Sequence, residues 1–242
     1  MSYTFSLKAD PCFHAFIPVQ YLIHAYMLLQ RMPMDPYSKD HLLSFYNFHL
    51  KKFGDRPEAL RWTPKGQLKR YHTLAAIAPA ENLDNSTVLD YGCGTGDFYR
   101  FLKRRGITVR YTGVDINKNF IDLAKSKYPE CTFKVLCADD DELEGFFDYI
   151  FICGVFNLQV PGIDDDLENA LVTLFKHCNK GLALNALSSH TPVKDPELHF
   201  TSPEDMVKFA IENLSPSVAL RHDRIENDFT LYVYTTFNDI EL

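Results

Sequence analysis

The chain has 242 residues, and its 25 basic and 32 acidic side chains give a net charge of −7. This length fits one large α/β domain, alone or with an appendage of about 40–60 residues. The 19 phenylalanines and 13 tyrosines argue against a disordered chain, because they supply ample apolar area for a core. The acidic balance argues against a broad nucleic-acid-binding surface, which needs lysine and arginine to displace counterions from phosphates.

The spacing of cysteines and histidines gives no indication of a metal site. The six cysteines are scattered without a Cys-x-x-Cys pair, and none of the nine histidines lies at ligand spacing. We therefore expect no metal, and reduced, mostly buried thiols in a cytoplasmic protein. The N-terminus lacks the pattern of a signal peptide, and the apolar stretch 13–29 is too polar for a membrane span, so no membrane partner is expected.

The first 60 residues have the pattern of helices. Apolar residues recur at helical spacing over 13–31 and 39–53, and prolines separate the two stretches. We interpret residues 1–60 as an N-terminal helical cap and residues 61–242 as a second domain. The aromatic residues of the cap suit packing against the body, a lid over an acceptor pocket, or a dimer face.

From about residue 85 onward, short apolar runs alternate with helical patterns, as is typical of a parallel sheet with crossover helices. The first five strands are expected at 87–89, 109–114, 132–136, 147–153 and 182–187.

The remaining elements complete an α/β sheet. A helix is expected over 164–178, ended by Gly181, and another from Ser202 to about Leu214. Strands at 218–220 and 229–235 follow with only a polar loop between them, which predicts that the last strand runs antiparallel to its neighbours. The sequence thus predicts a doubly wound sheet of seven strands.

A glycine-rich turn after the first strand indicates the kind of ligand. It runs Asp90-Tyr91-Gly92-Cys93-Gly94-Thr95-Gly96-Asp97-Phe98. A dinucleotide fingerprint would have its third glycine at position 97, where this chain has an aspartate that would repel a pyrophosphate. No Gly-Lys-Ser/Thr follows, so the turn is not a P-loop either. Two acids around a glycine turn suit a ligand with positive charge and no phosphate; the alternative is a purely structural turn.

This segment resembles the first motif of class I S-adenosylmethionine-dependent methyltransferases, an acid followed by Gly-x-Gly-x-Gly. The resemblance continues in register through Gly113-Val114-Asp115, Cys137-Ala138-Asp139-Asp140 and the segment 148–157. It implies a Rossmann-like fold, S-adenosylmethionine as cofactor and S-adenosylhomocysteine as product.

A closer resemblance covers roughly residues 42–235 and is to a bacterial subset of small-molecule type. Its first motif, Trp-x(4)-Gln-x-x-Arg-aromatic, is matched by Trp62, Gln67, Arg70 and Tyr71, and its last by 220–223 with 229–232. The resemblance implies that Arg70 holds the methionine carboxylate of the cofactor and that Trp62 and Gln67 line the same end. It also implies that the acid ending the second strand, Asp115, accepts both ribose hydroxyls.

The cofactor-binding set implied by these motifs is Trp62, Gln67, Arg70, Asp90, Gly92, Cys93, Gly94, Gly96, Asp97, Phe98, Asp115, Ile116, Asn117, Asp139, Asp140, Gly154 and Val155. Simpler interpretations stay open for some members. Asp97 also suits a helix cap, Asp139 and Asp140 a solvated acidic loop, and Trp62 a packing residue.

Residues after the later strands are expected to face the methyl acceptor, because parallel strands direct their carboxyl ends toward the ligand crevice. The catalytic candidates are Asn157, His190 and His222. A neutral imidazole can take a proton near pH 7, which makes either histidine a candidate general base. The alternative for both is a hydrogen-bonded surface histidine.

We therefore expect an enzyme that transfers the sulfonium methyl group to an oxygen or nitrogen nucleophile of a small molecule, such as a natural-product or metabolic intermediate. We expect it to act as a monomer or homodimer without a nucleic-acid partner. An RNA or protein methyltransferase on the same fold and a non-catalytic module that binds S-adenosylmethionine stay open as alternatives. A nicotinamide oxidoreductase is disfavoured by Asp97.

Overall fold

The computed structural model describes residues 34–136 and 143–237. The helices of this part are α2 (Pro36–Phe53), the 3-10 helix η1 (Pro57–Leu60), α3 (Pro64–Ala75), α4 (Ala80–Leu83), α5 (Asp97–Arg104), α6 (Lys118–Lys127), α7 (Ile163–Phe175) and α8 (Pro203–Asn213). Its strands are β1 (Thr87–Tyr91), β2 (Arg110–Asp115), β3 (Thr132–Val135), β4 (Phe147–Cys153), β5 (Cys178–Leu187), β6 (Val218–Ile225) and β7 (Asp228–Tyr234).

The seven strands of this part form one sheet in the order β3-β2-β1-β4-β5-β7-β6. Strands β1 to β5 pair in parallel, whereas β7 pairs antiparallel with both β5 and β6. The predicted doubly wound sheet with an antiparallel last strand is confirmed. Its strand order reverses between β1 and β4, and ligands of such sheets bind at the carboxyl ends of the strands beside that point.

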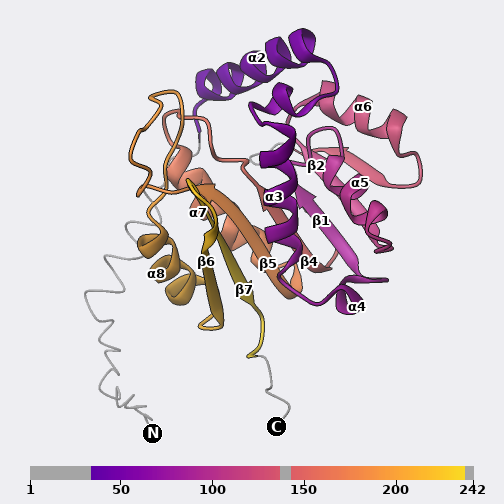
Figure 1. Cartoon of the computed structure of the whole chain (residues 1–242), viewed down its shortest axis with the longest axis vertical. Helices are drawn as coiled ribbons and strands as arrows, with labels where there is room; N and C mark the ends of the chain where they lie inside the picture. The colour runs from indigo at the N-terminus through magenta and orange to yellow at the C-terminus, as the bar shows by residue number, and fades with distance from the viewer. Residues whose placement is uncertain (1–33, 137–142, 238–242) are drawn as a thin grey trace, which may run out of the picture. The chain divides into compact units, whose positions relative to one another are not determined.

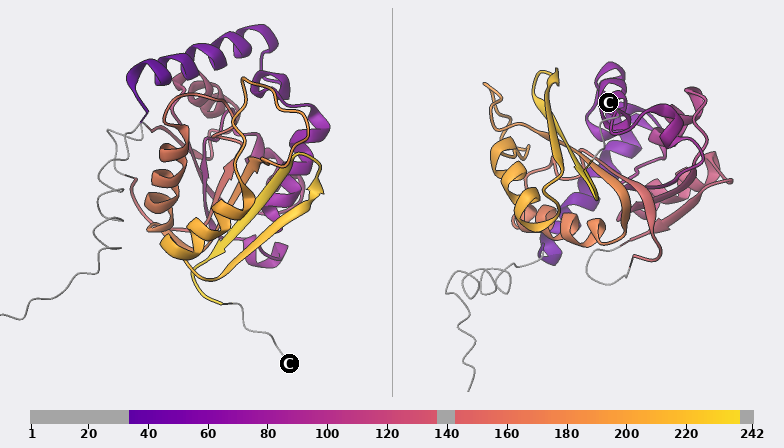
Figure 2. Two further views of the ribbon diagram at one scale, coloured as in Figure 1. Left: turned by 90° about the vertical axis from the view of Figure 1, so that its left-hand side faces the viewer. Right: turned by 90° about the horizontal axis from the view of Figure 1, so that it is seen from below.

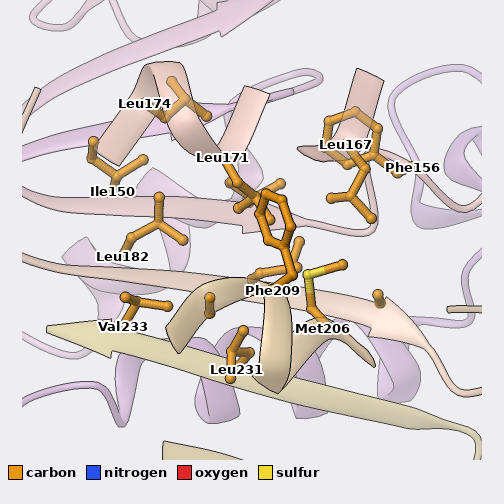
Figure 3. Packing of buried hydrophobic residues seen from close by; sticks show 14 of the residues in the cluster. Ile150, Phe156, Leu167, Leu171, Leu174, Leu182, Met206, Phe209, Leu231 and Val233 are labelled. Atoms are coloured by element: carbon orange, nitrogen blue, oxygen red, sulfur yellow. The ribbon is translucent and has the colours of Figure 1, made fainter. Parts of the chain in front are cut away.

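Helices cover both faces of the sheet (Figures 1 and 2). Alternate strand residues such as Val88 and Phe151 pack with apolar side chains from α3, α5 and α6. The residues between them, such as Ile150 and Leu182, pack with α7 and α8 on the other face (Figure 3). The segment 149–153 of β4 is buried on both faces and appears in the sequence as a continuous apolar run, whereas β5 is continuously buried only from Gly181 onward.

Helix α2 lies across the carboxyl ends of the parallel strands (Figure 1). Asp35 caps its N-terminus by accepting the backbone N–H groups of Tyr37 and Ser38. The helix contains the predicted helical stretch 39–53, whereas the stretch 13–31 lies outside the described residues. Within the described part, α2 belongs to the same compact unit as the sheet.

Gly181 does not end the helix before it, contrary to the sequence prediction. Helix α7 ends at Phe175, and Gly181 lies inside β5, which begins at Cys178. A Cβ at this position would come within 2.9 Å of the Ile77 side chain and 3.3 Å of the Tyr234 ring. The glycine is therefore a close-packing position within a strand and not a helix terminator.

The segment predicted as a polar loop between the last two strands is also mostly strand. β6 continues to Ile225, so Arg221, His222 and Asp223 lie within it and do not follow it. The strand is at the edge of the sheet, and most of its side chains are exposed. The length of a strand is predicted from its alternating apolar residues. An exposed edge strand does not require that pattern, so the full length of β6 could not be predicted.

Helix α3 was not predicted, although it begins with a recognisable signal. The Thr63 side chain accepts the backbone N–H of Gly66 at 3.0 Å, and Pro64 is the first helical residue. None of the helices among the described residues is long and apolar enough to cross a membrane.

Candidate cofactor and acceptor site

The glycine turn leaves β1 sharply and enters α5. The backbone N–H groups of Gly92 and Cys93 both donate to the Val114 carbonyl of β2, at 2.8 and 3.0 Å. Gly92 has a φ of +74°, and a Cβ there would lie 2.3 Å from the Val155 side chain. This turn therefore requires glycine for its backbone conformation and for the close approach of the loop after β4.

Asp115, at the end of β2, joins this turn to the next loop. Its carboxylate accepts the Gly94 N–H at 2.9 Å and the Asn117 N–H at 2.8 Å. Burial raises the pKa of Asp115 to about 6, and the two N–H donors oppose that rise. Each carboxylate oxygen keeps lone pairs for further donors, so the side chain remains able to accept hydroxyl groups.

Asp90 is a second carboxylate in the same region, and it is fully buried. Tyr111 on β2 donates its hydroxyl hydrogen to Asp90. Burial, followed by the nearby Asp115 carboxylate, raises the pKa of Asp90 to about 7, while the Tyr111 hydrogen bond lowers it. At neutral pH, the protonated and ionised forms of the Asp90 carboxyl are therefore both populated.

Asp97 is buried at the start of α5 and has cationic protein partners. Its carboxylate lies 3.0 Å from an Arg100 nitrogen and 3.2 Å from Lys127 Nζ, and Gln67 donates to it at 3.3 Å. The sequence analysis interpreted the negative charge of Asp97 as a partner for a cationic ligand. In the structure, Arg100 and Lys127 compensate that charge. The same Lys127 ammonium also donates to Asp55, just beyond the end of α2.

A cavity of about 300 Å³ lies beneath α2 at the carboxyl ends of β1, β2 and β4. The predicted cofactor residues that line it are Trp62, Asp90, Gly92, Cys93, Asp115, Ile116, Asn117, Gly154 and Val155. The lining side chains that the sequence motifs did not indicate come mainly from α2 and α7, among them Leu42, Leu43, Tyr46, Asn169 and Thr173.

Polar contacts join helix α2 to the start of α6. Asn47 Oδ1 accepts the side-chain amides of Asn117 at 3.0 Å and Asn119 at 2.9 Å. Tyr46 precedes Asn47 in the same helix. Burial, followed by the nearby Asp115 carboxylate, raises the pKa of the Tyr46 hydroxyl to about 12. A signal for the position of this helix was present, because Leu42 and Tyr46 are four residues apart and share one helical face.

Arg70 is engaged by an acid that the motifs did not indicate. Its guanidinium donates to both carboxylate oxygens of Asp228, at 2.7 and 2.9 Å, and lies 5.4 Å from the centre of the Trp62 ring. Arg70, Gln67, Gly94, Gly96, Asp97 and Phe98 are not among the described residues that line the cavity. Asp139 and Asp140 lie outside the described residues.

The three catalytic candidates do not line the cavity, within the part of the chain described. Asn157 is buried, and its Oδ1 accepts the Leu187 N–H at 3.4 Å. His190 and His222 are exposed, with ring centres 6.0 Å apart, and His190 Nε2 lies 2.6 Å from a Glu204 oxygen. The structure therefore brings the two histidines together at the β5–β6 end of the sheet, apart from the cofactor loops.

Comparison with known proteins identifies the type of domain. Residues 88–181 match a family model described as a methyltransferase domain. A Mycobacterium tuberculosis protein named as a methyltransferase is 27% identical over 157 residues, which cover 62% of this chain and 93% of that protein. The matched residues form a methyltransferase domain.

Further relatives of this methyltransferase extend the comparison. Over 80 residues it is 31% identical to the malonyl-[acyl-carrier protein] O-methyltransferase of Acetivibrio thermocellus, across 33% of this chain and 28% of that enzyme. Magnesium protoporphyrin IX methyltransferase from Synechocystis, solved with bound S-adenosylhomocysteine, shares its fold with a TM-score of 0.60 and 16% identity, over 82% of this chain and 100% of that one.

Proposed function

We propose that this methyltransferase transfers the methyl group of S-adenosylmethionine to an oxygen or nitrogen nucleophile of a small molecule. The observation that carries the proposal is the cavity of about 300 Å³, which Asp115 lines from the end of β2 and Leu42 and Tyr46 line from α2. Cofactor residues line one side of this cavity and α2 the other, so the acceptor is proposed to bind beside the cofactor in a concave site, as small molecules do. The net charge of −7 favours the same choice over RNA.

The residues present fit S-adenosylmethionine. Asp115 provides carboxylate oxygens for the ribose hydroxyls, and Ile116 provides apolar surface beside them for the adenine. Gly92 lets the backbone of the turn approach a ligand without a side chain in the way. The remaining members of the predicted cofactor set are proposed to contact the cofactor around Asp115, Ile116 and Gly92, with Trp62 and Arg70 at its amino-acid end.

The bound cofactor supplies a methyl group already activated on a sulfonium ion. The protein then has to hold the nucleophile in line with that group and keep water away. Helix α2 is proposed to do both, since Leu42 and Tyr46 present apolar surface to the cavity. Of the N-terminal cap proposed for residues 1–60, the part in α2 is thus proposed to cover the acceptor site.

None of the three catalytic candidates is among the described residues that line the cavity. We therefore propose His190 or His222 for proton removal, and Asn157 for orientation, only for an acceptor that extends beyond the cavity toward the β5–β6 end of the sheet. The variants His190→Ala and His222→Ala are expected to lower turnover severalfold and to leave the affinity for S-adenosylhomocysteine unchanged. The double variant decides the assignment. Full turnover in it would remove both histidines from the proposal and indicate an acceptor that needs no base.

The proposal is tested with S-adenosylmethionine carrying a labelled methyl group. The purified protein is incubated separately with a small-molecule extract, total RNA and total protein from one cell type. Label transferred to the small-molecule fraction supports the proposal. Label in RNA or protein would replace it with the corresponding macromolecular methyltransferase. Calorimetric titration with S-adenosylhomocysteine, with NAD as control, checks the cofactor separately.

A further inference from the structure

The Asn185 side chain, near the end of β5, contains a buried oxygen that lacks a protein partner. The residue is 1% exposed. Its amide nitrogen donates to the Phe229 carbonyl at 3.0 Å and lies 3.5 Å from Thr230 Oγ1. Among the described residues, nothing donates a hydrogen bond to its Oδ1. Nearly all buried polar side-chain atoms in proteins have a partner, so this exception requires an explanation.

The orientation of this amide is fixed by its neighbour. A carbonyl oxygen accepts hydrogen bonds and never donates them, so the Phe229 carbonyl requires the NH2 group of Asn185 on its side. Rotating the amide by half a turn would bring two oxygens together at that distance. The oxygen of Asn185 is therefore directed away from Phe229, and it can be satisfied only by a hydrogen-bond donor.

Asn185 lies directly beside the wall of the cavity. It pairs with Cys153 across the parallel β4–β5 ladder, so the two side chains emerge from the same face of the sheet. Cys153 lines the cavity, as does Gly154, whose N–H donates to the Asn185 backbone carbonyl at 3.1 Å. The Trp62 ring closes this part of the cavity, 2.8 Å from where a Cβ on Gly154 would be. Asn185 itself is not among the described residues that line the cavity, but its ladder neighbour Cys153 is.

The charges around Cys153 suit a zwitterion. Burial is the main cause that raises the pKa of the Cys153 thiol; the carboxylates of Asp90 and Asp228 add to the rise, and Arg70 opposes it. Both signs of charge therefore act at this end of the cavity. Asp228 takes two of the five N–H donors of the Arg70 guanidinium, which leaves others for an anionic group.

We infer that Asn185 Oδ1 accepts a hydrogen bond from the α-ammonium group of the cofactor's amino-acid end, beside the carboxylate that Arg70 is proposed to hold. The inference rests on the proposed placement of the cofactor. Its basis in the structure is the buried Asn185 oxygen, whose orientation is fixed and whose residue pairs with Cys153 at the cavity wall.

Three ligands separate the groups of the amino-acid end. S-adenosylhomocysteine carries both the ammonium and the carboxylate, S-adenosyl-3-thiopropylamine carries only the ammonium, and 5′-methylthioadenosine carries neither. Their dissociation constants are measured calorimetrically on the full chain and on the variants Asn185→Leu and Asn185→Val. Asn185→Leu keeps the volume and removes the acceptor, and Asn185→Val, which also lacks an acceptor, is the second choice if the first unfolds. Thr230→Val is the matched control, since it changes the adjacent buried group and leaves the oxygen in place.

We expect Asn185→Leu to weaken S-adenosylhomocysteine and S-adenosyl-3-thiopropylamine by roughly tenfold or more, because the lost bond is to a charged donor. The affinity for 5′-methylthioadenosine should stay the same, and Thr230→Val should change none of the three. Equal weakening of all three ligands, or no weakening of any, would overturn the inference. Lower turnover with unchanged affinities would assign Asn185 to the methyl acceptor instead. If none of the ligands binds the unaltered protein, the cofactor placement itself fails.

Discussion

Arg70 and Asp228 form a two-point ion pair between residues 158 positions apart in the chain. The pair joins α3 to the start of β7, and the Asp228 side chain is only 1% exposed. Arg70 in turn lies over the Trp62 ring, whose Cζ2 atom is close to Gly154 at the cavity wall. The pair therefore holds Trp62 in position as well as compensating a buried charge.

Asp228→Ala is expected to destabilise the fold by about 3 kcal/mol, because it leaves a largely buried guanidinium without its partner. Chemical denaturation with a fluorescence readout of Trp62 measures the change. The double variant Arg70→Met with Asp228→Leu should recover much of the lost free energy of unfolding, since it removes both charges. A double variant as unstable as the single one would show that packing, and not charge, dominates at this position.

The parts of the fold that the sequence predicts well are those whose local pattern has one interpretation. β4 has the predicted bounds, since its continuous apolar run is buried on both faces. Gly181 shows the opposite case. A glycine after a helical pattern suits a helix end, and only the packing of Ile77 and Tyr234 against β5 shows why it lies in a strand.

The site divides in the same way. The loop residues that line the cavity, such as Gly92 and Asp115, follow from local motifs. The partners of Arg70 and Asp97 do not, because Asp228 and Lys127 reach them only through the tertiary fold. The position of an exposed edge strand is equally invisible to apolar patterning, which is why His222 was expected after β6 and lies within it.

The affinity for S-adenosylhomocysteine is expected to fall as the pH is lowered through the pKa of Asp115, about 6. On the proposed placement of the cofactor, protonation removes the carboxylate charge that attracts the ribose hydroxyls, so binding at pH 5 should be about tenfold weaker than at pH 7.5. Calorimetric titration across this range gives the profile. The variant Asp115→Asn should bind S-adenosylhomocysteine weakly at every pH, without a change in affinity near pH 6. A change that persists in Asp115→Asn would assign the titration to another group.

Asp90→Asn should stabilise the fold more at high pH than at low pH. Burial raises the pKa of this carboxyl from 3.8 to about 7. The unaltered protein therefore loses stability as the pH rises through that interval, whereas the neutral amide does not. The gain in free energy of unfolding should be on the order of 2–3 kcal/mol larger at pH 8 than at pH 5.

Tyr111→Phe supplies the control for this assignment. The Tyr111 hydroxyl donates to the ionised Asp90 and so lowers the pKa of that carboxyl. Removing the hydroxyl should shift the loss of stability to higher pH. A pH dependence that is identical in the unaltered protein, in Asp90→Asn and in Tyr111→Phe would show that Asp90 does not titrate in this interval.

Gly92→Ala should damage the turn by collision as well as by backbone strain. Gly106 has almost the same φ, +73° against +74°, but a Cβ added there would have no atom within 4 Å, whereas one added at Gly92 would lie 2.3 Å from Val155. Gly106→Ala therefore measures the cost of the left-handed backbone alone, about 1–2 kcal/mol. Gly92→Ala should cost more and should also weaken S-adenosylhomocysteine, and adding Val155→Ala should restore part of both losses. Equal costs for the two single variants would mean that the loop after β4 moves aside without strain, and the tight contact between the two loops would then have no part in shaping the cofactor site.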